Sequence, residues 1–127
     1  MLAKILQTLG LFKNKQVQSD SFLIQCRQNT FDNIYPADES VKSTDGYKTL
    51  KDISENYFKN NKQDEFANYL MEGQYFVQLW AAHMLLEYGS PSKYLTTKCL
   101  DEIKKYSNST LNSEVAAQET LWLKNFS

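Results

Sequence analysis

The apolar residues of this chain recur at helical spacing, and no segment shows the alternation typical of strands. The clearest run lies in residues 75–88, where Val77, Trp80, Ala81 and Met84 follow the i, i+3, i+4, i+7 pattern. Other apolar residues fill most of the remaining circumference, which predicts a helix buried on nearly every side at the centre of the domain. We therefore expect Trp80 to lie in the core.

Boundary signals follow this segment. Gly89 stands where a helix with a left-handed C-terminal cap would end, and Ser90 and Pro91 suit the N-cap and the first position of a next helix. That helix is predicted over residues 91–106, and Ser113 is the candidate N-cap of a last helix. The second half of the chain should therefore hold helices in close succession.

The first half has weaker patterns. They predict helices in residues 17–34, 46–60 and 64–71, and an amphipathic segment in residues 1–12 that docks on the core or, alternatively, lies on a membrane surface. Residues 35–46 are rich in turn formers and acids, which predicts the longest exposed loop. No apolar run reaches transmembrane length. These patterns predict one all-α domain, residues 1–127, with five to six helices and a cytoplasmic location.

Composition narrows the range of functions. With 42% hydrophobic and 23% charged residues, the chain is too apolar to be disordered. The net charge is −1, and no segment has the basic density that nucleic-acid backbones require. Cys26 and Cys99 are isolated and the four glycines are scattered, which leaves no disulfide framework, metal-ligand motif or phosphate-binding loop. We expect no metal, no cofactor and no nucleic-acid partner.

The single histidine is the main candidate for acid-base or nucleophilic chemistry. His83 lies mid-helix among apolar residues, where a packed or hydrogen-bonded role is favoured over a catalytic one. Acidic pairs such as Asp101 and Glu102 are adjacent in sequence and do not share a helical face, unlike a positioned acid-base pair. Both cysteines fall on inward faces and should behave as small apolar residues. The sequence therefore predicts a protein that is not an enzyme.

Two segments resemble a known family. The run NYLMEGQYFVQLWAAHMLLEYG, residues 68–89, resembles the DUF2019 family of small HEAT-like bacterial proteins, whose typical helix reads Val-Arg-x-x-Ala-Ala-x-x-Leu-Leu, with Gln78 in place of the arginine. The run EVAAQETLWLK, residues 114–124, is similar to that family's last helix. The resemblance implies a small HEAT-like α-α superhelix over residues 45–126, with residues 1–44 as divergent N-terminal helices and the acidic loop.

Members of that family and similar helical-repeat proteins are often found as immunity proteins of bacterial polymorphic or contact-dependent toxin systems. The resemblance implies a protein that binds and neutralises a cognate toxin domain. A nuclease is one candidate target, because nuclease active sites are basic and exposed acids would speed their capture. We expect a monomer or weak dimer. The alternative is a generic helical adaptor for another protein. Tyrosines beside acids suit a basic protein surface. The candidate partner-binding residues are Tyr35, Asp38, Glu39, Asp45, Glu72, Gln74, Tyr75 and Gln78.

Overall fold

The computed structural model describes residues 20–126, and this part of the chain contains helices and no strand. The all-α prediction is confirmed for these residues. Six α-helices and two 3-10 helices follow one another in the order α3 (Ser21–Phe31), η1 (Glu39–Val41), α4 (Asp45–Lys59), α5 (Gln63–Phe66), η2 (Ala67–Met71), α6 (Val77–Tyr88), α7 (Lys93–Ser107) and α8 (Ser113–Asn125).

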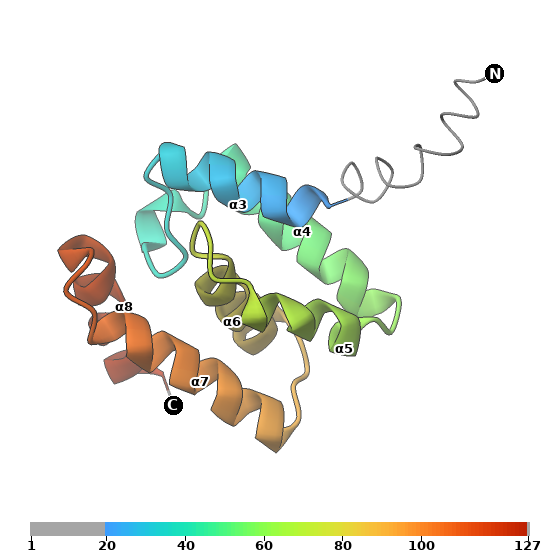
Figure 1. Cartoon of the computed structure of the whole chain (residues 1–127). Helices are drawn as coiled ribbons and strands as arrows, with labels where there is room; N and C mark the ends of the chain where they lie inside the picture. The colour runs from blue at the N-terminus through green and yellow to red at the C-terminus, as the bar shows by residue number, and fades with distance from the viewer. Residues whose placement is uncertain (1–19, 127) are drawn as a thin grey trace.

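Helix α6 forms the centre of the molecule, as its sequence predicts. Every residue from Leu79 to Leu85 is buried, and Trp80 is fully inaccessible to solvent. Because α6 has no extended polar face, it is stable only where other helices cover it. Helices α3, α4 and η2 cover it from one side and α7 from the other, so α6 lies between the first and the last helices of the described residues (Figure 1).

Successive helices pack on one another. Helix α3 packs on α4, α5 packs on α4 and η2, η2 packs on α6, and α7 packs on both α6 and α8. Figure 1 shows α7 and α8 side by side at the opposite end from α3 and α4. This sequential packing joins neighbours along the chain through short connections. The HEAT-like superhelix stays a prediction.

An aromatic cluster holds the N-terminal helices together. The ring of Phe66 lies edge-on to Phe22 of α3 at 5.0 Å and to Tyr57 and Phe58 of α4 at 5.3 and 5.0 Å. Edge-to-face geometry is the arrangement that aromatic quadrupoles favour. The hydroxyl of Tyr69 also donates to Asp20 Oδ1 at 2.9 Å, so the start of α3 is fixed to η2.

The start of α7 differs from the predicted one. The N-cap is Ser92, whose Oγ accepts from the Leu95 amide at 3.1 Å, so the assignment of Ser90 and Pro91 to the cap was wrong. The Ser90 amide instead donates to Gln63 Oε1 at 2.7 Å. Gly89 is extended, with φ −98°, and forms no left-handed cap. The Gln63 side chain, which comes from α5, therefore supplies the contact that local capping rules missed.

Other boundaries moved by a few residues. Asp20 caps α3, which is shorter than the predicted helix over 17–34, and Asn112 rather than Ser113 caps α8. The predicted helix over 64–71 changes from α-helix to 3-10 helix at Ala67. The amphipathic segment in residues 1–12 lies outside the described residues. Among the helices of residues 20–126, none combines the length and hydropathy needed to cross a bilayer.

The burial of Trp80 leads to a first prediction. We expect Trp80→Ala to reduce the free energy of unfolding by about 3–5 kcal/mol, because a large cavity would remain in the middle of α6. Leu121→Ala is the control, because the Leu121 side chain is 60% exposed on α8 and its loss should change stability little. Urea denaturation followed by circular dichroism measures both. Equal stability of the two variants would contradict the central position of Trp80.

Candidate protein-binding site

The turn before α6 has an unusual backbone. Tyr75 and Phe76 are consecutive and both lie in the left-handed region, with φ of 49° and 58°. Bulky residues rarely adopt this conformation, and each such residue costs about 1–3 kcal/mol unless its surroundings hold it there. Gly73, which could adopt it freely, does not have a positive φ. The backbone strain of this turn is therefore at two aromatic residues, Tyr75 and Phe76.

Packing and hydrogen bonds hold the turn in place. The half-buried ring of Phe76 contacts Tyr35 at 5.2 Å and Tyr106 at 5.8 Å between ring centroids. The Val77 amide donates to the Gln74 carbonyl at 2.9 Å, and the Thr30 hydroxyl lies 3.3 Å from the carbonyl oxygen of Tyr75. Phe76 thus anchors the turn from within, while the neighbouring side chain of Tyr75 is left at the surface.

Tyr75 is part of an exposed aromatic group. Its ring lies edge-on to Phe31 of α3 at 6.0 Å, and the side chain of Phe31 is 60% exposed. The guanidinium of Arg27 lies 5.3 Å from the centre of the Phe31 ring and 5.8 Å from that of Tyr75. Tyrosine and arginine are enriched among the residues that dominate protein-protein affinity. The composition of this group is that of an interface anchor.

Hollows open on both sides of Tyr75. One, of about 270 Å³, lies between α3 and the turn and is lined by Leu23, Ile24, Arg27, Glu72, Gln74, Tyr75 and Val77. The other, of about 320 Å³, lies between the turn and the α7–α8 connection and is lined by Gly73, Tyr75, Phe76, Tyr106, Ser109, Leu111, Asn112 and Val115. We call these two hollows, together with Phe31, the turn face.

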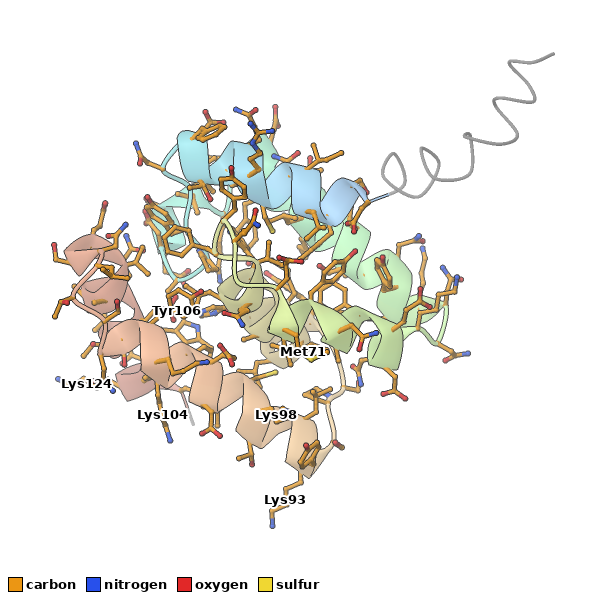
Figure 2. The ribbon with its side chains drawn as sticks, viewed as in Figure 1. Met71, Lys93, Lys98, Lys104, Tyr106 and Lys124 are labelled. Carbon is orange, nitrogen blue, oxygen red and sulfur yellow. The ribbon has the colours of Figure 1, made fainter. Side chains whose placement is uncertain are left out.

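A third hollow of about 500 Å³ separates η2 from α7. Met71 of η2 and Lys98 of α7 line it from facing sides (Figure 2). Met71, Tyr94 and, on the turn face, Leu111 have side chains that are 77%, 73% and 95% exposed. Most large apolar side chains that residues 20–126 expose therefore border these three hollows. Grouped apolar exposure of this kind marks interaction surfaces.

Four of the predicted site residues lie here. Glu72, Gln74 and Tyr75 line the same hollow of the turn face, as their closeness in sequence suggests. Gln78 lies in the third hollow instead, where its Oε1 accepts from the Tyr106 hydroxyl at 3.4 Å. Arg27 and Phe31 were missed, because only tertiary packing brings α3 against the turn.

The predicted loop over residues 35–46 is only partly exposed. Tyr35 was expected at the surface, but its side chain is buried, with the ring on Phe76 and the hydroxyl 3.3 Å from Asn33 Oδ1. The prediction that Tyr35 is exposed for a partner was wrong, because Phe76 needs a hydrophobic contact on this side. Val41 is also buried, within η1.

The three acids of this segment have different surroundings. Asp38 caps η1, and its Oδ1 accepts from the amide and the hydroxyl of Ser40. Glu39 is exposed and pairs with Lys42 at 3.3 Å, and Asp45 is exposed in the first turn of α4. Glu39 and Asp45 are therefore more exposed than Asp38, which is half-buried. None of the three lines the turn face.

A buried ionisable cluster lies on the other side of α6. His83 Nδ1 lies 2.8 Å from Glu87 Oε2, and His83 Nε2 lies 2.7 Å from Glu119 Oε1 on α8. His83 and Glu119 are buried, while Glu87 reaches the surface and accepts from Lys42 at 3.4 Å. The prediction that His83 is a packed, hydrogen-bonded residue is confirmed. Its i, i+4 spacing to Glu87 was visible in the sequence, but the contact with Glu119 was not.

Contacts within the cluster change the pKa values of His83 and Glu87. Burial lowers the pKa of His83, but the hydrogen bonds and charges of Glu119 and Glu87 outweigh burial and raise the pKa above its usual 6.5. Burial raises the pKa of Glu87, yet His83 and Lys42 together bring it below its usual range. These directions describe an imidazolium that pairs with the carboxylate of Glu87.

The two cysteines lie apart from both sites. Each is buried and free. Burial and the charge of Glu102 raise the pKa of Cys99 to about 12, and burial with the charge of Asp20 raises the pKa of Cys26. Both thiols stay protonated near neutral pH, so neither has the character of a reactive nucleophile. Among residues 20–126, no group of His, Cys, Asp and Glu side chains is arranged to hold a metal ion.

Comparison with known proteins finds no matching family model, no similar curated protein and no similar solved structure.

The buried cluster supports a prediction about stability. Glu119→Ala should reduce the free energy of unfolding at pH 7 by about 3–5 kcal/mol, because it leaves the His83 ring buried without one partner. The double variant His83→Leu/Glu119→Leu replaces the pair with apolar side chains and should be clearly more stable than Glu119→Ala. Urea denaturation of the three proteins makes the comparison. A single variant as stable as the parent would show that the ion pair contributes nothing.

Proposed function

We propose that this protein binds another protein through the turn face, and that the partner is a toxin domain which it neutralises by covering the toxin's active site or substrate surface. The observation that carries the binding proposal is the exposed Tyr75, held by a left-handed backbone between Phe31 and a hollow on either side.

Backbone strain at this position supports a functional role. Strained residues persist where the surrounding structure holds them, and they cluster at binding and catalytic sites. Here the left-handed turn holds the Tyr75 ring 5.8 Å from the guanidinium of Arg27 on α3, which gives a preformed aromatic and cationic pair. A side chain fixed before binding loses less conformational entropy when a partner docks. The turn face therefore has both the composition and the rigidity of an interface anchor.

Neutralisation by covering a surface needs no chemistry from the binding protein. It requires only tight, specific contact. Apolar residues such as Ile24 and Leu111 supply contact area around Tyr75, and Glu72 and Gln74 supply polar groups at the edge. The exposed carboxylates of Glu39 and Asp45 add long-range attraction for a basic partner.

The identity of the partner rests on sequence resemblance, not on geometry. The segments 68–89 and 114–124 resemble small helical proteins found as immunity proteins. Residues 73–76 of the turn fall within the first segment. An adaptor with another protein partner would use the same surface. Rescue of bacterial growth from a toxin domain encoded next to this gene distinguishes the two functions.

The binding surface can be tested by truncating its anchor. Tyr75→Ala should weaken binding to the toxin domain by about 30-fold or more, because interface tyrosines of this kind contribute about 2 kcal/mol or more. Leu121→Ala is the matched control, because Leu121 is also exposed and apolar but borders none of the three hollows. Calorimetric titration measures both affinities. Equal binding by Tyr75→Ala and the parent protein would remove the turn face from the interface.

The role of the acidic residues Glu39 and Asp45 can be tested by measuring association rates. Glu39→Lys/Asp45→Lys should slow association with a basic toxin several-fold at low ionic strength, and the difference should shrink as salt is added. Asp64→Lys/Glu65→Lys makes the same charge change on α5, away from these two residues, and serves as the control. Stopped-flow association gives the rates. If both double variants slow association equally, net charge and not the position of these two residues provides the attraction.

A further inference from the structure

The polar and aromatic contacts between α8 and α6 are concentrated at one residue of α6. Helix α8 packs along α7, and in the described part of the chain the hydrogen bonds and ring contacts between α6 and α8 all involve His83. His83 contacts Glu119 at 2.7 Å and lies edge-on to the Trp122 ring at 4.6 Å. A change in the charge or the hydrogen bonds of His83 therefore acts directly on the contact between α6 and α8.

Two ionised carboxylates at these distances need two ring protons. Both nitrogens of His83 lie within 2.8 Å of a carboxylate oxygen, and a carboxylate can only accept. A neutral imidazole has one N–H and can donate to one of the two. When the ring releases a proton to solvent, one carboxylate must face a nitrogen lone pair, and that arrangement is repulsive.

Glu87 and Glu119 respond differently when His83 loses its second ring proton. Glu87 is partly exposed and keeps Lys42 as a partner. Glu119 is fully buried, and its second oxygen, Oε2, has no hydrogen-bond partner among the described residues. A buried carboxylate without a donor is strongly disfavoured. Loss of the imidazolium charge therefore costs Glu119 more than Glu87, because among the described residues Glu119 has no other cation as a partner and stays buried while α8 is closed.

Other polar and charged groups lie on the elements that pack against α6. Lys42 and Glu39 approach Glu87 from η1 and its C-terminal end, and Tyr47 of α4 bonds to Tyr88 of α6 at 2.7 Å between hydroxyl oxygens. On α7, Glu102 pairs with Lys105 at 3.0 Å. The lysine lies on the Glu87 side, so no cation near Glu119 replaces the proton of His83 in the described structure.

The position of α8 also affects the turn face. Val115, in the first turn of α8, and its N-cap Asn112 line the hollow between Tyr75 and the α7–α8 connection. Displacement of α8 would therefore remove one wall of this hollow, on the side of Tyr75 that faces away from α3.

We propose that the contact between His83 and Glu119 is a proton-dependent latch that fastens α8 to α6 and thereby keeps the turn face formed. The effect on partner binding rests on the function proposed above, whereas the latch itself is a property of the isolated protein.

The direction of the pH effect follows from linkage. Because the pKa of His83 is raised in the closed structure, the closed form holds the proton more tightly than a form with α8 released. The stabilisation is complete below histidine's usual pKa near 6.5 and is lost as the pH rises through the raised value. Between these values, opening of α8 releases one proton, so the opening constant should increase by up to tenfold per pH unit.

The test is hydrogen exchange of α8 amides in the full-length protein between pH 6 and 9, with rates corrected for the intrinsic effect of pH. In the parent protein, the opening constant of amides in Val115–Leu123 should rise with pH in the window described. In His83→Gln it should not depend on pH, and amides of α4 serve as the internal reference in both. Because the chain has one histidine, its ring protons give an unambiguous NMR titration.

Two results would overturn the latch. One is a His83 titration at or below 6.5, and the other is an α8 opening constant in the parent protein that does not change with pH. Both measurements use the parent protein, so they decide the matter even if His83→Gln does not fold. Glu119→Gln gives a second comparison, since it keeps the shape of the side chain and should remove most of the pH dependence. Neither measurement uses a partner, so failure of the latch and failure of the turn face in the Tyr75→Ala experiment are separate results.

Discussion

A helix with no polar face imposes the main constraint on this fold. Helix α6 is apolar around nearly its whole circumference, and water on any side of it would expose large side chains such as Trp80. The helices on either side of it cover these surfaces, with α3, α4 and η2 on one side and α7 on the other (Figure 1). The positions of both candidate sites follow from this arrangement, because each uses residues of α6 or of the turn that leads into it.

The few polar residues of α6 link it to different neighbours. Gln78 bonds to Tyr106 on α7, His83 to Glu119 on α8, and Glu87 to Lys42 at the end of η1. Apolar packing gives affinity between helices but tolerates small rotations, whereas a buried polar contact is satisfied in one arrangement only. Each of these contacts therefore fixes the orientation of a different element relative to α6. For the buried ion pair of His83 and Glu119, the cost of desolvation offsets the gain in stability, so its main effect is to fix the orientation of α8.

The sequence predicted much of the fold because its signals are local. The spacing of apolar residues located α4, α6, α7 and α8, and it identified the central helix, because burial on all sides leaves a direct trace in composition. Capping rules failed where a distant side chain took part, as at Ser90, whose amide is bound by Gln63. Tyr35 was misplaced for a related reason. A tyrosine in an acid-rich turn is expected to be exposed, and only the position of Phe76 explains its burial.

The candidate sites were harder to predict, since both depend on contacts between residues far apart in the chain. Tyr75 was identified, but its neighbours Arg27 and Phe31 lie more than forty residues earlier. Glu119 is an ordinary surface residue by sequence, and its burial against His83 depends on how α8 packs on α7. The two sites share α6, with the strained turn at its N-terminal end and the ionic cluster one to three turns further on. Strain at Phe76 favours release of the turn, and covering of α6 by α7 and α8 opposes it, because the Phe76 ring lies against Tyr106 and Val115 lines the adjoining hollow. The exposed conformation of Tyr75 is therefore maintained by the same packing that the His83 contact supports, which is the physical reason why the two sites should respond to each other.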